Sequence, residues 1–113
     1  MTRMTILAAL ALGAATAQAQ PLANDYPTEA RADYVFACMA VNGETREALS
    51  RCSCSIDVIA SILPYARYVE AETVLAMRQT GGEKTAIFRS APLMRDLVAD
   101  LRRAQAEGDI RCF

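Results

Sequence analysis

The four cysteines are the feature that most constrains how this chain can fold. They stand at positions 38, 52, 54 and 112 of 113 residues, and the stretch RCSCSID over 51–57 separates two of them by a single residue. In a short exported protein an even number of cysteines typically forms disulfides, because the compartment is oxidising. In the cytoplasm the same pattern would favour a metal-binding or catalytic site. The interpretation of the cysteines therefore depends on where the chain is sent.

The N-terminal sequence predicts export. Arg3 precedes an apolar run over 6–15 and an A-x-A motif over 17–19, which together are typical of a secretory signal peptide. The apolar run has about ten residues, whereas a membrane-spanning helix needs about 20. We therefore expect a signal peptide over 1–19 that is cleaved near Ala19, and no membrane span.

The remaining chain is expected to form a leader and one domain. Pro21 and Pro27 favour an extended, flexible leader over 20–27. Residues 28–113 are near the size at which a hydrophobic core alone is only modestly stabilising, so cross-links become useful. The sequence has 12 basic and 13 acidic residues, and removal of the signal peptide removes Arg3. The mature chain would therefore carry a net charge of −2. This balance provides no basic face for nucleic acid or for an anionic membrane.

Apolar residues recur at helical spacing, and no strand-like alternation is present. Predicted helices cover 30–41 with Thr28 as N-cap, 46–63 with Thr45 as N-cap, 65–80, a turn or two over 83–89, and 92–107. The apolar stripe of the second helix consists of Leu49, Cys52, Ile56, Ile59, Ala60 and Leu63, and that of the last helix of Met94, Leu97, Val98, Leu101 and Ala104. Gly108 is expected to end the last helix before a tail over 109–113. The fold class is all-α, a small bundle of about four helices stapled by two disulfides.

The C-x-C pair on the second helix leaves two disulfide pairings open. At 100° per residue, Cys52 and Cys54 point about 200° apart, so a bridge between them is disfavoured. The alternatives are 38–52 with 54–112, or 38–54 with 52–112, and in both one helix anchors the first helix and the C-terminal tail. A closely spaced thiol pair could instead exchange disulfides or bind Cu(I), but no thioredoxin-like context surrounds it.

Catalysis and metal binding are not expected. The chain has no histidine, which excludes Ser-His-Asp and Cys-His nucleophile systems, histidine-ligated zinc and C-x-x-C-H haem attachment. Its acidic residues are scattered and form no calcium-binding loop. We therefore predict no enzyme activity, no metal and no cofactor. Tyr65 and Tyr68 are candidates for a partner surface, since tyrosine is favoured at interfaces; the alternative is that they pack the join between the second and third helices.

The chain resembles a family of small exported four-cysteine proteins. The likeness lies in YPTEARADYVFACM over 26–39, RCSCSID over 51–57, YVEAET over 68–73 and IRCF over 110–113. The family has no established activity and is associated in Gram-negative bacteria with periplasmic PQQ-dependent alcohol or methanol dehydrogenase systems. The resemblance implies a non-catalytic periplasmic accessory protein that binds another periplasmic protein, such as a component of a quinoprotein dehydrogenase system. The alternative hypothesis is a thiol-disulfide redox or copper-handling protein that uses the C-x-C pair.

Overall fold

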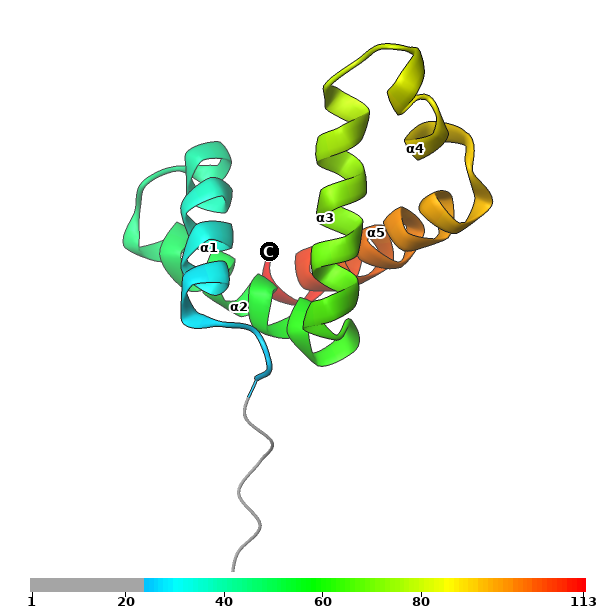
Figure 1. Ribbon diagram of the computed structural model, residues 1–113. Helices are drawn as coiled ribbons and strands as arrows, with labels where there is room; N and C mark the ends of the chain where they lie inside the picture. Colours follow the sequence, from blue (N-terminus) through cyan, green and yellow to red (C-terminus); the bar gives the residue numbers. More distant parts are fainter. Residues whose placement is uncertain (1–23) are drawn as a thin grey trace, which may run out of the picture.

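A computed structural model describes residues 24–113, and this range is helical without strands (Figure 1). The elements are α1 (Thr28–Asn42), α2 (Arg46–Ile62), α3 (Tyr65–Gln79), a 3-10 turn η1 (Glu83–Thr85), α4 (Ile87–Ser90) and α5 (Pro92–Cys112). The all-α prediction is confirmed. The predicted signal peptide over 1–19 and residues 20–23 lie outside the described residues.

Capping residues, proline and glycine determine where the helices begin and end. The hydroxyl of Thr45 accepts a hydrogen bond from the backbone N–H of Ala48 at 3.0 Å, so the predicted N-cap of α2 is confirmed. Pro64 separates α2 from α3 and stands immediately before the first residue of α3. Proline has no backbone N–H, so it can start a helix but cannot continue the hydrogen bonds of the preceding one. Gly81 and Gly82 end the α3 segment with φ of 72° and 89°, values that favour glycine.

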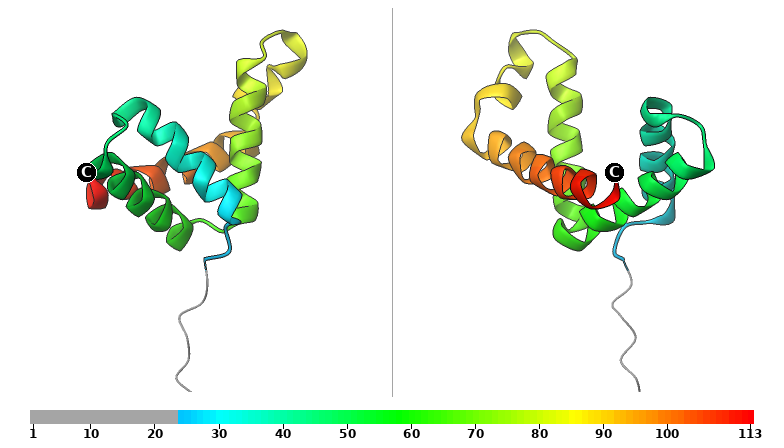
Figure 2. Two further views of the ribbon diagram at one scale, coloured as in Figure 1. Left: turned by 90° about the vertical axis from the view of Figure 1, so that its left-hand side faces the viewer. Right: turned by 180° about the vertical axis from the view of Figure 1, so that it is seen from behind.

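The core lies where α2 packs against α5, the most extensive contact between any two helices. Its buried residues confirm the two predicted apolar stripes, apart from Leu49, which is 38% exposed. α1 and α3 extend from this core on two sides of an opening, and in Figure 1 and the right view of Figure 2 the C-terminus lies between them. The principal packing partner of α1 is α2, whereas α3 packs mainly against α5.

Two disulfides hold α2 to the helices on either side of it. Cys38 of α1 is bonded to Cys52, with Cα atoms 5.8 Å apart, and Cys54 is bonded to Cys112 of α5, with Cα atoms 5.7 Å apart. This is one of the two pairings that the sequence left open. Cys52 is fully buried and Cys54 is exposed, as expected for side chains that point to different sides of one helix. The C-x-C pair is therefore a double anchor.

Gly108 does not end the last helix, so that prediction was wrong. α5 continues through Gly108 to Cys112, and no separate tail forms. Gly108 is buried against α2, where a Cβ atom would lie 2.6 Å from Oγ and 3.2 Å from the backbone oxygen of Ser55. Ser55 is itself buried and shares a 3.0 Å hydrogen bond with the hydroxyl of Tyr34 on α1. The glycine therefore serves the close approach of two helices.

The leader is also ordered where the structure describes it. Tyr26 is only 3% exposed, and its hydroxyl donates a 2.7 Å hydrogen bond to the backbone oxygen of Leu63. The carboxylate of Asp25 accepts a 3.0 Å hydrogen bond from the backbone N–H of Tyr65, at the start of α3. The flexible leader predicted over 20–27 is therefore wrong for residues 24–27. Thr28 likewise is the first residue of α1 and not its N-cap, a position that Pro27 holds.

Candidate functional site

The first helix has an apolar composition that its packing does not explain. The polar residues among its 15 are Thr28, Glu29, Arg31, Asp33 and Asn42. A helix that is apolar on most sides is normally buried. None of the residues of α1 is buried, however, because its main contact is with α2 alone. This helix therefore presents uncovered apolar surface.

The uncovered surface of α1 faces two directions. Val41 is 85% exposed, the highest value among the large apolar side chains of the described residues, and Phe36 is 76% exposed, a value that Ile110 of α5 equals. Phe36 and Val41 are five positions apart on the helix, so they point about 140° apart. On its third side α1 is fixed to α2 by the Cys38–Cys52 disulfide and by the hydrogen bond from Tyr34. The helix is thus held rigidly with both free sides outward.

One free side of α1 borders a hollow of about 490 Å³ beside α2, here named the α1–α2 groove. Its apolar lining consists of Ala32, Val35, Phe36, Met39, Leu49 and Ile56. Arg31 and Asp57 contribute charge at its margin. The partial exposure of Leu49 follows from its position in this groove.

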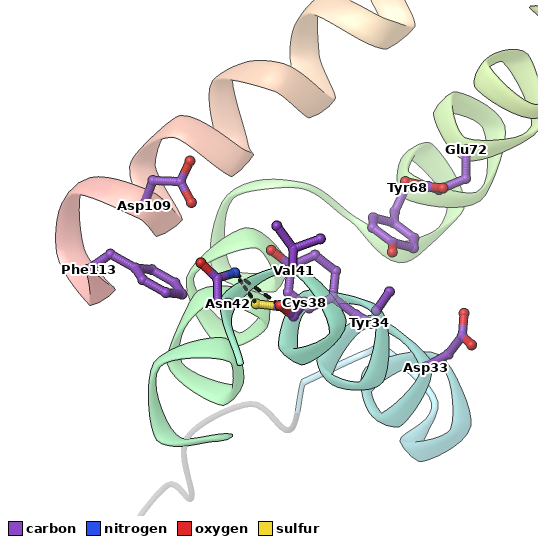
Figure 3. A pocket seen from close by; sticks show the side chains of 10 residues that line it. Asp33, Tyr34, Cys38, Val41, Asn42, Tyr68, Glu72, Asp109 and Phe113 are labelled. Atoms are coloured by element: carbon purple, nitrogen blue, oxygen red, sulfur yellow. Dashed lines mark hydrogen bonds between the residues drawn. The ribbon is translucent and has the colours of Figure 1, made fainter. Parts of the chain in front are cut away.

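The other free side of α1 faces α3 across two adjoining hollows of about 590 and 780 Å³, named here the α1–α3 groove. Both hollows are lined by Asp33 of α1 and by Tyr68 and Glu72 of α3, so they adjoin each other at these residues. Figure 3 shows Asp33 and Val41 on the α1 side opposite Tyr68 and Glu72, with Phe113 of the C-terminal end beside them. The groove combines aromatic walls with carboxylates.

Four carboxylates line this groove without a basic partner. They are Glu29, Asp33, Glu72 and Asp109, and none forms an ion pair within residues 24–113. Outside the groove, Glu47, Glu70, Asp100 and Glu107 each pair with an arginine, whereas the remaining acidic residues of the described chain form no ion pair. No lysine or arginine is among the residues that line the groove.

The surroundings of Glu72 alter its titration. Desolvation of its carboxyl raises the pKa of Glu72 above its usual range, Arg102 acts in the opposite direction, and the carboxylate of Asp33 raises the pKa further. Arg102 therefore only partly offsets the effect of desolvation on the carboxyl group of Glu72. Asp33 and Glu72 come from different helices, and both line the two hollows of the groove.

Tyr65 and Tyr68 have two roles in the structure. The centroid of the Tyr26 ring lies 5.1 Å from that of each of the other two rings. The Tyr26 hydroxyl donates a hydrogen bond to the backbone oxygen of Leu63, the residue between α2 and Pro64. The three rings therefore pack the join between α2 and α3, as one of the two alternatives predicted. Both tyrosines also line the α1–α3 groove. Burial raises the pKa of Tyr26 and of Tyr68, so both hydroxyls stay neutral.

Neither a free thiol nor a cluster of metal ligands is found among residues 24–113. All four cysteines are in disulfides, so neither Cys52 nor Cys54 carries a free thiol. Across residues 24–113 no group of three or more cysteine, aspartate or glutamate side chains converges as a metal site would require. No helix in this part of the chain combines the length and the apolar character needed to cross a bilayer.

Comparisons with known proteins add no further constraint on function. Neither the protein families, nor the curated proteins, nor the solved structures contain a significant match to this chain. Function is therefore inferred from the surfaces of α1 and from the resemblance seen in the sequence.

Proposed function

We propose that this protein is a non-catalytic periplasmic accessory protein that binds another protein through α1. The observation that carries the proposal is that α1 is apolar on several sides and has no buried residue. A large exposed apolar surface on a small domain typically marks an interaction site. Burial of one side chain such as Phe36 contributes about 1.5–3 kcal/mol, so a few of these residues suffice for specific binding.

The disulfides support this proposal because they hold the binding helix in place. Cys38–Cys52 fixes α1 to α2, and Cys54–Cys112 fixes α2 to α5. A surface that is rigid before association loses less conformational entropy when it binds. Without the Cys38–Cys52 cross-link, α1 would depend for its position on non-covalent packing, mainly against α2.

The resemblance to exported four-cysteine proteins supports a place for the partner in quinoprotein alcohol oxidation. We propose that the partner belongs to a periplasmic PQQ-dependent dehydrogenase system and that this protein carries no quinone itself. The alternative, a redox or copper-handling role, needs free thiols at Cys52 and Cys54, and both are bonded to other cysteines. The accessory role is therefore better supported.

The proposal predicts that Phe36→Ser reduces partner binding at least about tenfold, because central aromatic residues dominate interface energies. The exported protein with an affinity tag is isolated from the periplasm of cells grown on an alcohol, and co-purified proteins are quantified by mass spectrometry. Ile87→Ser on α4 is the matched control, because Ile87 is 58% exposed and lies outside both grooves. Equal recovery of the same partner with both variants would contradict the proposal.

A further inference from the structure

We infer that the α1–α3 groove binds a cationic amphipathic helix of the partner protein. The inference rests on the proposed function and adds the chemistry of the segment that is recognised. The groove concentrates carboxylates, and no lysine or arginine is among the residues that line it. Glu29, Asp33, Glu72 and Asp109 line the groove without an ion pair in the described chain.

The carboxylates are spaced as a helical ligand would require. Glu29 and Asp33 are four residues apart, so they lie one above the other on the same side of α1. Glu72 faces them from α3, and Asp109 of α5 extends the acidic margin at the other end of the groove. Lysine or arginine residues at positions i and i+4 of a bound helix would match the spacing on α1.

The walls between the carboxylates are apolar or aromatic. Tyr34 and Val41 line the groove from α1, Tyr68 from α3 and Phe113 from the C-terminal end. These side chains stand opposite one another in Figure 3, with Val41 almost fully exposed. An apolar stripe flanked by cations would fill this groove, whereas a purely polar cation such as a polyamine would leave the aromatic walls uncovered.

A helix fits the groove better than an extended segment does. Both long walls are helices, and α1 with its 15 residues is about 22 Å long, enough to contact four turns of a third helix. Residues 24–113 contain no strand, so an extended ligand would find no sheet edge to satisfy its backbone groups. A helix satisfies its own backbone hydrogen bonds and needs only side-chain contacts.

The titration of Glu72 provides a reporter for this contact. In the free protein desolvation raises its pKa, with Arg102 opposing and Asp33 adding to the increase. A cation placed between Asp33 and Glu72 favours both ionised carboxylates, so it must lower the pKa of Glu72. By linkage, binding strengthens as the pH rises through the pKa of Glu72 in the free protein.

The test uses the full exported protein and a synthetic 15-residue helical peptide with leucine on one face and lysine on both flanks. Asp33→Asn combined with Glu72→Gln is expected to weaken binding about tenfold by calorimetry, as for the loss of two partly desolvated ion pairs. Glu83→Gln combined with Asp96→Asn removes the same charge outside the groove and is expected to leave affinity within twofold. Neutralisation relieves the repulsion between Asp33 and Glu72, so the groove variant should fold, which circular dichroism checks.

A second experiment uses NMR to follow the titration of the side-chain carboxyl carbon of Glu72. Its pKa is expected to fall when the lysine peptide is added and to stay unchanged with a peptide that has glutamate in place of lysine. Equal affinity of the two charge variants, or an unchanged pKa at saturation, would overturn the inference. So would self-association of the protein in sedimentation experiments that is abolished by the groove variant, because a second copy would then occupy the groove.

The outcome is separable from that of the proposed function. If partner recovery from periplasm depends on Phe36 but not on Asp33 and Glu72, α1 binds a partner and the acidic groove is not its site. That result overturns the inference and leaves the proposed function standing. If both the Phe36 variant and the groove variant lose the partner, the proposed function and the inference about the groove both stand.

Discussion

Replacing Cys54 and Cys112 together by alanine is expected to lower the free energy of unfolding by about 4 kcal/mol. Their disulfide spans 58 residues, and a cross-link over a long loop removes more conformational freedom from the unfolded chain than one over a short loop. Cys54 is exposed and Cys112 half-buried, so truncation of these side chains adds little loss of packing. Small domains have a total stability of about 5–15 kcal/mol, so this is a large fraction.

The other disulfide provides the comparison. Cys38 and Cys52 are 14 residues apart, for which the same chain-entropy relation gives about 3 kcal/mol. Fully buried Cys52 adds a packing loss to that value when it becomes alanine. Urea unfolding of both double variants and of the parent protein measures these differences. A loss below about 1 kcal/mol for the Cys54 and Cys112 variant would contradict the role of that disulfide as a staple.

Gly108→Leu is expected to destabilise the protein by about 3 kcal/mol, because an added side chain has no space between α5 and α2. The first added atom already lies 2.6 Å from Oγ of Ser55 and 3.2 Å from its backbone oxygen. Leucine has a higher helix propensity than glycine, so a loss of stability must come from packing. Displacement of Ser55 would also break its hydrogen bond to Tyr34 and loosen α1.

Ala106→Leu on the same helix is the control, because Ala106 is exposed. Its effect is expected to stay within about 0.5 kcal/mol. Thermal and urea unfolding of both variants compare the two positions. If Gly108→Leu were as stable as Ala106→Leu, the close approach of α2 and α5 at Ser55 would be wrong.

The sequence predicts those parts of the fold that depend on local periodicity and capping. The stripe of α2 and the N-cap at Thr45 are found as predicted, because both signals lie within one helix. Gly108 misled the prediction, since glycine favours a helix end locally but here permits contact with Ser55, a residue 53 positions earlier. Tyr26 was placed in a flexible leader because nothing near it in the sequence shows the contact with Leu63.

The candidate site was less predictable for the same reason. Its members, such as Asp33 and Glu72, lie on helices that do not follow one another in the chain, and their proximity depends on how far α1 and α3 stand apart. The apolar character of α1 is visible in the sequence, but the sequence does not show that the helix stays uncovered. The sequence identified Tyr65 and Tyr68 as surface candidates. Their position in the groove and their contacts with the ring of Tyr26 are visible only in the structure.

Site-specific photo-crosslinking in living cells tests the central proposal, that α1 is the partner-binding surface, most directly. The photoreactive residue p-benzoylphenylalanine replaces Phe36 on α1 in one strain and Ile87 on α4 in another, and cells grown on an alcohol are irradiated. We expect a discrete adduct between this protein and a second periplasmic protein from position 36 and none from position 87. No adduct from position 36, or the same adduct from both positions, would contradict it.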